Sequence, residues 1–167
     1  MNVLVVGAGA MGRWFADAVR ADDVGIAFAD PDDAAASAAA DAVDGRTVPL
    51  DTDESFTAVC IAVPIPVAVE AIATHADRAE RALIDVTGVA AEPVAAMREH
   101  APDRERLSLH PLFAPENEPG NVAAVVDAAG STTDAVRDAL TARGNDVFET
   151  TADEHDRAME TVQAKTH

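Results

Sequence analysis

The sequence predicts an α/β fold in which a doubly wound, mostly parallel sheet carries helices on both faces. Short runs rich in valine, isoleucine and leucine alternate along the chain with alanine-rich stretches of helical composition. Such alternation is typical of parallel strands joined by crossover helices. At 167 residues the chain also has the length of one domain of ordinary size.

The predicted strands can be followed from the N-terminus. They cover residues 3–6, 24–28, 59–63, 83–86, 107–109, 121–128 and 146–149. After the first strand, five apolar residues recur at helical spacing, so that one helix face can pack on the sheet: Met11, Trp14, Phe15, Ala18 and Val19. The tract 34–42 has the composition of a helix. Ser131 and Thr151 each open a pattern resembling a capping box, which predicts two further helix starts.

Acidic residues dominate the charge of the chain. Thirty Asp and Glu oppose twelve Lys and Arg, which gives a formal net charge of -18. Because such self-repulsion destabilises a compact state at low ionic strength, we interpret the composition as a halophilic adaptation to salt, where screening lengths are about 3 Å or less. The same field repels phosphate backbones and anionic lipids, so no nucleic-acid partner and no membrane partner are expected.

Two further features favour a cytoplasmic protein. No apolar run approaches the roughly 20 residues that span a bilayer, and the N-terminal residues lack the basic segment of a secretory signal. The single cysteine, Cys60, lies in an apolar run, and we expect it to be a buried thiol.

A glycine-rich motif lies between the first predicted strand and the first predicted helix. It reads Gly7-Ala8-Gly9-Ala10-Met11-Gly12 and matches the G-x-G-x-x-G fingerprint of dinucleotide-binding sites. Gly7 permits a tight turn, Gly9 lets the backbone approach a pyrophosphate, and Gly12 lets the helix lie close to the strand. This context predicts a Rossmann-like fold with cofactor contacts from Gly7, Gly9, Ala10, Met11 and Gly12.

Other cofactor contacts are expected at the carboxyl ends of the strands, where open α/β sheets bind ligands. Asp30 ends the second apolar strand, and a carboxylate there can accept hydrogen bonds from the adenosine ribose and repel a 2′-phosphate. This favours NAD over NADP; one more surface acid is the alternative interpretation of Asp30. Val63, Pro64 and Thr87 leave two later strands and are also predicted to contact NAD.

His110 leaves a further predicted strand and precedes the apolar, proline-containing segment 111–115. A neutral imidazole, with an ordinary pKa of about 6.5, can accept a hydroxyl proton while hydride leaves the same carbon. We therefore predict that His110 is the general base of an alcohol oxidation. The alternative is a histidine that merely ends a strand and bonds to loop backbone.

The last predicted helix carries polar residues on one stripe. His155, Met159, Gln163 and His167 follow at intervals of four residues, which places them on one face. This stripe can face the crevice; the alternative is a packing face with the histidines at its rim. No metal site is expected, because neither cysteine nor a partner carboxylate accompanies the histidines.

Four segments together resemble the prephenate dehydrogenase family. They are the glycine fingerprint, Asp85-Val86-Thr87-Gly88-Val89, the loop His110-Pro111-Leu112-Phe113-Ala114-Pro115, and the helix from His155-Asp156-Arg157 through Val162-Gln163. The resemblance implies NAD-dependent oxidative decarboxylation of prephenate to 4-hydroxyphenylpyruvate in tyrosine biosynthesis, with His110 as the catalytic histidine. It also implies substrate contacts from His155, Gln163, His167 and the Gly88 position. Arogenate, which differs from prephenate in an amino group, is an alternative substrate.

The resemblance also implies a division of the chain. Residues 1–150 would form the NAD-binding domain, and residues 151–167 the start of a helix that would lead into a helical dimerisation and substrate domain, absent from this sequence; a homodimer is therefore an open expectation. Two positions depart from the family, because Gly88 stands where serine is usual and Ala90 where lysine is usual. In the family, the serine hydroxyl would orient the histidine and the nicotinamide, and this sequence lacks that hydroxyl.

Two other functions remain open at this point. One is another NAD-dependent reductase of the same fold, such as a hydroxyacid or imine reductase, although these usually carry a catalytic lysine and Lys165 is the single lysine here. The other is a non-catalytic NAD-binding module.

Overall fold

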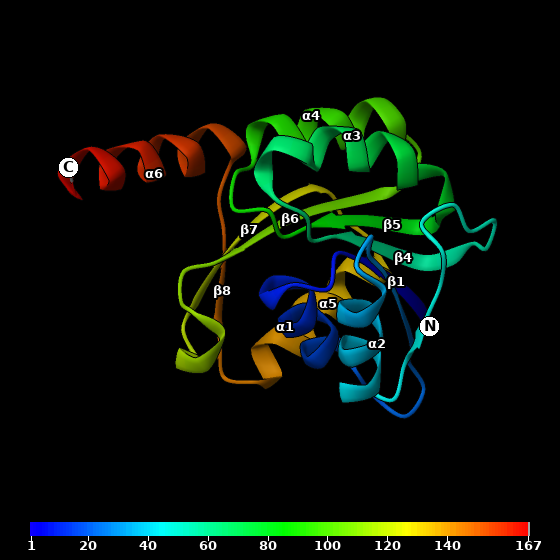
Figure 1. Cartoon of the computed structure of the whole chain (residues 1–167). Helices are drawn as coiled ribbons and strands as arrows, with labels where there is room; N and C mark the ends of the chain where they lie inside the picture. The colour runs from blue at the N-terminus through cyan, green and yellow to red at the C-terminus, as the bar shows by residue number, and fades with distance from the viewer. Residues whose placement is uncertain (167) are drawn as a thin grey trace.

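An eight-stranded sheet forms the centre of the molecule (Figure 1). The computed structural model describes the backbone of residues 1–166 and the side chains of residues 1–161. The strands are β1 (Asn2–Val6), β2 (Gly25–Ala29), β3 (Arg46–Thr47), β4 (Phe56–Ile61), β5 (Ala79–Asp85), β6 (Glu105–Pro111), β7 (Asn121–Ala128) and β8 (Asp146–Glu149). The helices are α1 (Ala10–Val19), α2 (Asp33–Ala42), α3 (Ile65–His75), α4 (Ala91–His100), α5 (Ser131–Ala142) and α6 (Ala152–Thr166), with short 3-10 turns η1 (Ala76–Arg78) and η2 (Pro115–Asn117).

The strands lie in the order β3-β2-β1-β4-β5-β6-β7-β8. Strands β1 to β6 are parallel, β7 runs antiparallel to β6, and β8 is parallel to β7. The order reverses between β1 and β4, and such a switch point is where open α/β sheets bind ligands. The predicted doubly wound, mostly parallel sheet with helices on both faces is thus confirmed.

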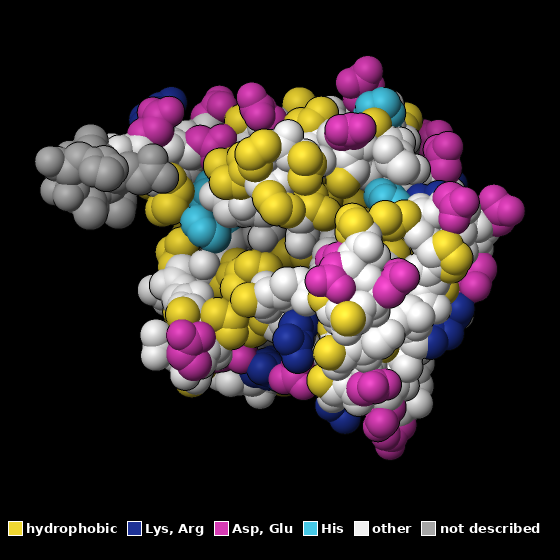
Figure 2. Space-filling view, in the orientation of Figure 1, with side chains coloured by type: hydrophobic (Ala, Val, Ile, Leu, Met, Phe, Trp, Pro, Cys, Tyr) yellow, Lys and Arg dark blue, Asp and Glu magenta, His cyan; other side chains and the backbone are white. Residues whose placement is uncertain are grey.

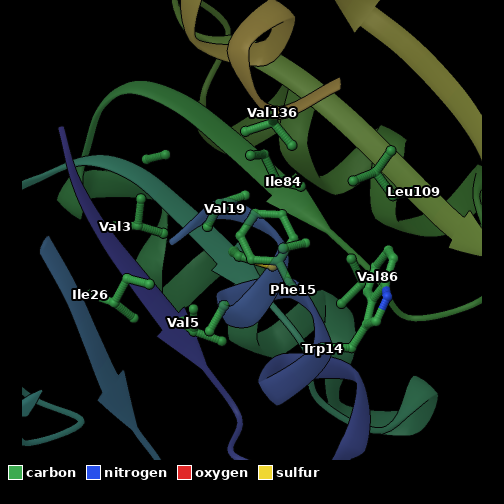
Figure 3. Close-up of a cluster of buried hydrophobic side chains, with 14 of the residues drawn as sticks. Val3, Val5, Trp14, Phe15, Val19, Ile26, Ile84, Val86, Leu109 and Val136 are labelled. Carbon is green, nitrogen blue, oxygen red and sulfur yellow. The ribbon is translucent and has the colours of Figure 1, made fainter. Parts of the chain in front are cut away.

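The two faces of the sheet are covered by different helices. In Figure 1, α1, α2 and α5 lie below the sheet and α3 and α4 above it, while α6 projects from the side of α4. The helical spacing after β1 has the predicted effect, since Trp14, Phe15, Ala18 and Val19 are buried. Figure 3 shows Phe15 among Val5 and Ile84 on this face. None of the helices described is both long and apolar enough to cross a membrane.

The opposite face is packed by a second apolar cluster. Ile72 of α3 and Met97 of α4 are fully buried there together with Val59 and Leu83 of the sheet. Cys60 is also fully buried, and burial raises the pKa of its thiol well above the ordinary value. The expectation of a buried, unreactive thiol agrees with this position.

Three local details differ from the sequence prediction or extend it. Strand β3, of only two residues, was not predicted. Helix α5 begins at Ser131, but its N-cap residue is Gly130, and the Glu105 carboxylate of β6 accepts a hydrogen bond from the Thr133 amide at 2.8 Å; the expected cap at Ser131 is therefore wrong. Thr151 does cap α6, because its hydroxyl accepts a hydrogen bond from the Glu154 amide at 3.1 Å.

Candidate nucleotide-binding and catalytic site

A crevice opens at the carboxyl ends of β1, β2, β4 and β5. Its volume is about 820 Å³, within the roughly 300–1,000 Å³ typical of small-molecule sites. Figure 2 shows apolar side chains gathered along the hollow between the helix layers, with acidic side chains mainly around it. Asp30 follows β2 and Thr87 follows β5, so these two residues leave the outermost of the four strands.

The glycine-rich loop forms one wall of this crevice. Gly7 has a φ of +108°, a conformation that residues with a side chain rarely adopt. A β-carbon at Gly12 would collide with the Gly7 carbonyl oxygen, so only glycine lets α1 lie this close to the loop. A β-carbon at Gly9 would meet no atom within 4 Å, and no side chain caps the first turn of α1. Its amides are therefore available to an anion, and Ala10 and Met11 line the crevice beside them.

Asp30 ties the glycine-rich loop to the end of β2. Its Oδ2 accepts a hydrogen bond from the Ala8 amide at 2.8 Å, and its Oδ1 accepts one from the Asp32 amide at 2.8 Å. The side chain is half-buried and lines the crevice. Because each carboxylate oxygen can accept a second hydrogen bond, Asp30 can hold the loop and still bind the hydroxyl groups of a ribose.

The other wall of the crevice is apolar. Val63 and Pro64 join β4 to α3, and Pro64 is the N-cap residue of that helix. Ile65 and Val67 of the first helical turn are 48% and 44% exposed and line the same space. Such a wall suits the flat, uncharged parts of a ligand rather than its phosphates.

His75 lines the crevice as well, although it was not predicted to belong to the site. The residue is 4% exposed. Burial, and then the positive charge of Arg78, lower the pKa of His75 to about 4. The ring is therefore neutral at pH 7, and its Nδ1 accepts a hydrogen bond from the Arg78 guanidinium.

His110 lies near the carboxyl end of β6 and adjoins the crevice beside Thr87. A β-carbon added at Gly88 would be 3.6 Å from Nε2 of His110, and Gly88 has a φ of +92°. The other ring nitrogen, Nδ1, lies 2.7 Å from Nε2 of His155. Burial, and then the nearby His155, lower the pKa of His110, while Asp156 opposes this. The ring is therefore neutral at pH 7 and presents Nε2 toward Gly88.

His155 is placed differently from the predicted substrate contact. Its side chain is 4% exposed, and both ring nitrogens are engaged: Nε2 by His110 and Nδ1 by Oδ1 of Asp156 at 3.0 Å. Both ring nitrogens thus have partners within the chain, which does not favour the predicted substrate contact. The side chain of Gln163 and the whole of His167 lie outside the described residues, and their predicted substrate contacts stay predictions.

Asp156 was not predicted to belong to the site, although it follows His155 directly. Its Oδ1 and Oδ2 each accept a hydrogen bond at 2.9 Å, from the amides of Ala90 and Ala91 respectively. Desolvation raises the pKa of Asp156, but the hydrogen bonds from His155 and from these amides outweigh it and hold the pKa below its ordinary value. Asp156 is thus a carboxylate at neutral pH that joins α6 to the start of α4.

Asp85 is a second buried acid close to the site. Its Oδ2 accepts hydrogen bonds from the Thr87 amide at 3.0 Å and the Thr87 hydroxyl at 2.7 Å, whereas Oδ1 has no partner among the described residues. Burial raises the pKa of Asp85 to about 6. Across the part of the chain that the structure describes, no group of three or more His, Cys, Asp or Glu could hold a metal ion.

Taken together, the crevice offers an uncapped helix N-terminus and the side chain of Asp30, and the neutral ring of His110 lies near Gly88, the residue after Thr87 of the crevice lining. The comparisons with known proteins agree with this arrangement. Residues 15–130 match the family model described as prephenate dehydrogenase, nucleotide-binding domain. A curated relative, 4-amino-4-deoxyprephenate dehydrogenase of Streptomyces pristinaespiralis, is 34% identical over 181 aligned positions, which cover 99% of this chain and 59% of the relative.

Solved structures show the same fold. Prephenate dehydrogenase from A. aeolicus, in complex with hydroxyphenyl propionate and NAD+, superposes with a TM-score of 0.77 at 21% identity, covering 93% of this chain and 62% of that one. Synechocystis arogenate dehydrogenase superposes with a TM-score of 0.77 at 15% identity, covering 95% and 62%. The chain thus spans about three fifths of the length of these relatives. On the family match, this chain belongs to the prephenate dehydrogenase family and contains its nucleotide-binding domain.

Proposed function

We propose that this chain is an NAD-dependent dehydrogenase that converts prephenate to 4-hydroxyphenylpyruvate by oxidative decarboxylation, a step of tyrosine biosynthesis. The observation that carries the proposal is the position of His110: a neutral ring beside the nucleotide crevice, with Nε2 facing the space above Gly88. The family match supports the same class of reaction. It also disfavours the hydroxyacid and imine reductases that the sequence left open.

The residues around the crevice fit NAD. The uncapped first turn of α1 and the open space at Gly9 would receive the pyrophosphate. Asp30 would accept hydrogen bonds from the adenosine ribose, and its charge would repel the 2′-phosphate of NADP. Val63, Pro64 and Thr87 would contact the remainder of the cofactor. When bound, NAD supplies the acceptor for the hydride that leaves the substrate.

The protein's own part in this reaction is to hold and move a proton. Nε2 of His110 accepts the proton of the substrate hydroxyl while hydride leaves the carbon that bears this hydroxyl. Because the two transfers are coupled, no full positive charge develops on the substrate ring. The lowered pKa of His110 keeps the ring neutral at pH 7, so one of its nitrogens is free to accept a proton. Loss of carbon dioxide then makes the ring aromatic.

A second candidate substrate carries an amino group in place of that hydroxyl. The curated relative is named for 4-amino-4-deoxyprephenate, and Gly88 leaves no side-chain hydroxyl beside Nε2 of His110. An amine nitrogen stabilises developing positive charge on the neighbouring carbon through its own lone pair. Oxidation of the amine therefore depends less on a base than oxidation of the alcohol. Arogenate, with its hydroxyl in place, would use His110 as prephenate does.

Three sequence predictions enter this proposal without further support from the described residues. They are the division between residues 1–150 and 151–167, assembly as a homodimer, and a cytoplasmic, high-salt setting. The net charge of -18 supports the last of these. It also fixes the assay conditions, since the chain should be studied in concentrated potassium chloride.

The proposal is tested by NADH formation with prephenate and with its 4-amino analogue, and by replacement of NAD with NADP. His110→Ala should lower kcat with prephenate by about 10²- to 10⁴-fold and leave NADH affinity unchanged. The loss with the amine should be smaller. His100→Ala is the matched control, because His100 lies at the far end of α4 away from the crevice and should retain full activity.

Other outcomes point to other functions. Undiminished turnover of prephenate in His110→Ala would remove this residue from the mechanism. Binding of NADH without turnover of any of these substrates would favour the non-catalytic NAD-binding module. Equal use of NADP would overturn the role given to Asp30.

A further inference from the structure

A continuous chain of polar contacts links His110 to the start of α4. Nδ1 of His110 lies 2.7 Å from Nε2 of His155, Nδ1 of His155 lies 3.0 Å from Oδ1 of Asp156, and Asp156 accepts the amides of Ala90 and Ala91. The two imidazole rings meet edge to face, at 76° and 4.9 Å between centroids. The links from His110 to His155 and from Asp156 to Ala90 and Ala91 join segments far apart in the sequence, so the chain exists only in the folded protein.

The positions of the protons along this chain follow from its charged end. Asp156 is ionised at neutral pH and can only accept hydrogen bonds. Nδ1 of His155 must therefore donate to it. In a neutral His155 ring, Nε2 then carries a lone pair and no proton, so the proton between the two histidines belongs to Nδ1 of His110. Nε2 of His110 is left as the free acceptor.

We propose that His155 and Asp156 are positioning residues that hold His110 in the tautomer with its proton on Nδ1. This inference rests on the function proposed for His110, since it explains why Nε2, the nitrogen beside Gly88, is the one able to take a proton. When Nε2 accepts the hydroxyl proton, the O–H bond breaks and an N–H bond forms. The positive charge on His110 then strengthens its hydrogen bond to His155, which Asp156 polarises in turn.

Asp156 also sets the distance between Gly88 and His110. Residue 88 lies two positions before Ala90, and Ala90 is the N-cap residue of α4, without a capping side chain of its own. Asp156 provides the missing acceptor for both Ala90 and Ala91. The same carboxylate therefore holds the segment that carries Gly88 and orients the ring that faces it.

The tautomer can be measured without cofactor or substrate. Long-range ¹H–¹⁵N spectra of the full chain, labelled with ¹⁵N-histidine in concentrated potassium chloride, distinguish a protonated from a bare ring nitrogen. We expect Nε2 of His110 to be bare and Nδ1 to carry the proton. His155→Leu removes the acceptor and should give a mixture of the two tautomers, whereas in His155→Gln the amide oxygen can accept the same proton and should restore the wild-type pattern.

Activity provides a second, independent readout. His155→Leu should lower kcat by about tenfold to a hundredfold with little change in KM, and His155→Gln should recover most of that loss. Met159→Ala is the matched control, because it removes a half-buried side chain one turn further along α6 and leaves both nitrogens of His155 engaged. It should leave the tautomer and kcat unchanged even if the melting temperature falls.

Two results would overturn the inference: a proton on Nε2 of His110 in the wild type, or an unchanged tautomer in a folded His155→Leu variant. If that variant does not fold, Asp156→Asn replaces it, because loss of the charge frees His155 to donate from Nε2 and should shift His110 toward the other tautomer. A protein with the expected tautomer and no turnover would instead reject the proposed function alone.

Discussion

The two faces of the sheet differ in what they bury, and β5 and β6 show the difference residue by residue. Ile84, Leu107 and Leu109 belong to the apolar cluster packed by α1, α2 and α5. Their neighbours Asp85, Ser108 and His110 point to the opposite face, toward α4 and α6, because successive side chains of a strand alternate. At these positions one face of the two strands is apolar, while the other carries a polar row beneath the helices.

The two faces of the sheet therefore contribute differently: the apolar face to stability and the polar face to function. Burial of apolar surface stabilises the fold, whereas a buried polar or charged group costs free energy unless it is fully paired. Asp85 has an oxygen without a partner among the described residues, so the polar row carries a cost that the apolar face does not. We infer that the α4 and α6 face keeps these groups for the chemistry at His110, as functional sites commonly do.

The largest effect on stability is expected when a large side chain of the apolar face is replaced by a small one. Phe15 is fully buried on α1, and Phe15→Ala should lower the free energy of unfolding by about 3–5 kcal/mol, through lost burial and the cavity left behind. Urea unfolding in concentrated salt measures this. Phe148→Ala is the control, because Phe148 is 38% exposed. This variant should lose much less free energy of unfolding.

The same variant tests whether the two faces are independent. In folded Phe15→Ala, the tautomer of His110 should be that of the wild type. A loss of stability below about 1 kcal/mol, or a change of tautomer, would contradict the division between the faces.

A smaller, pH-dependent effect is expected on the polar face. The pKa of Asp85 is about 6 in the folded chain against an ordinary value of 3.8. Because the folded pKa is the higher one, ionisation of Asp85 does not lower stability below about pH 4; stability falls as the pH rises from about 4 to about 6 and then levels off. With about 1.36 kcal/mol for each pKa unit, the loss approaches roughly 3 kcal/mol by pH 7 to 8.

In the Asp85→Asn variant, the asparagine side chain has nearly the shape of aspartate but does not ionise. The unfolding free energy of the wild type, minus that of this variant, should therefore fall between pH 4 and pH 7 and then level off. A constant difference across that range would show that folding does not raise the pKa of Asp85.

The fold was more predictable than the site because it depends on local patterns. The strands at 121–128 and 146–149 have their predicted bounds, since valine and phenylalanine at their centres favour extended backbone. Strand β3 could not be predicted, because Arg46 and Thr47 are both exposed and polar, and they pair with β2 only in the folded sheet.

The site was predictable only where it follows from strand ends. The rule that ligands bind beyond the strands pointed to Asp30, which lines the crevice, and to His110, whose ring lies near Gly88; their roles stay predictions. It could not reveal that His155 lies behind His110, because that contact spans 45 residues and depends on where α6 packs. His75 was not predicted to line the crevice for a similar reason: its place at a helix end does not show what the folded chain packs around it.

The smallest effect is expected at Gly88, where the polar face meets the crevice. Its φ of +92° costs a residue with a side chain about 1 kcal/mol. Gly88→Ala and Gly88→Ser should both lose about this much stability, since the added β-carbon, 3.6 Å from Nε2 of His110, makes only ordinary contact. The difference between the two variants isolates the hydroxyl.

In Gly88→Ser the hydroxyl can donate to the bare Nε2, whereas Gly88→Ala offers no donor. The ¹⁵N shift of Nε2 should therefore move in the serine variant alone, and the ratio of prephenate to amine turnover should change with it. Identical Nε2 shifts in the two variants would mean that Nε2 already carries a proton or points away from residue 88. The comparison of the two variants therefore tests whether Nε2 is the nitrogen of His110 that accepts a proton at the polar face.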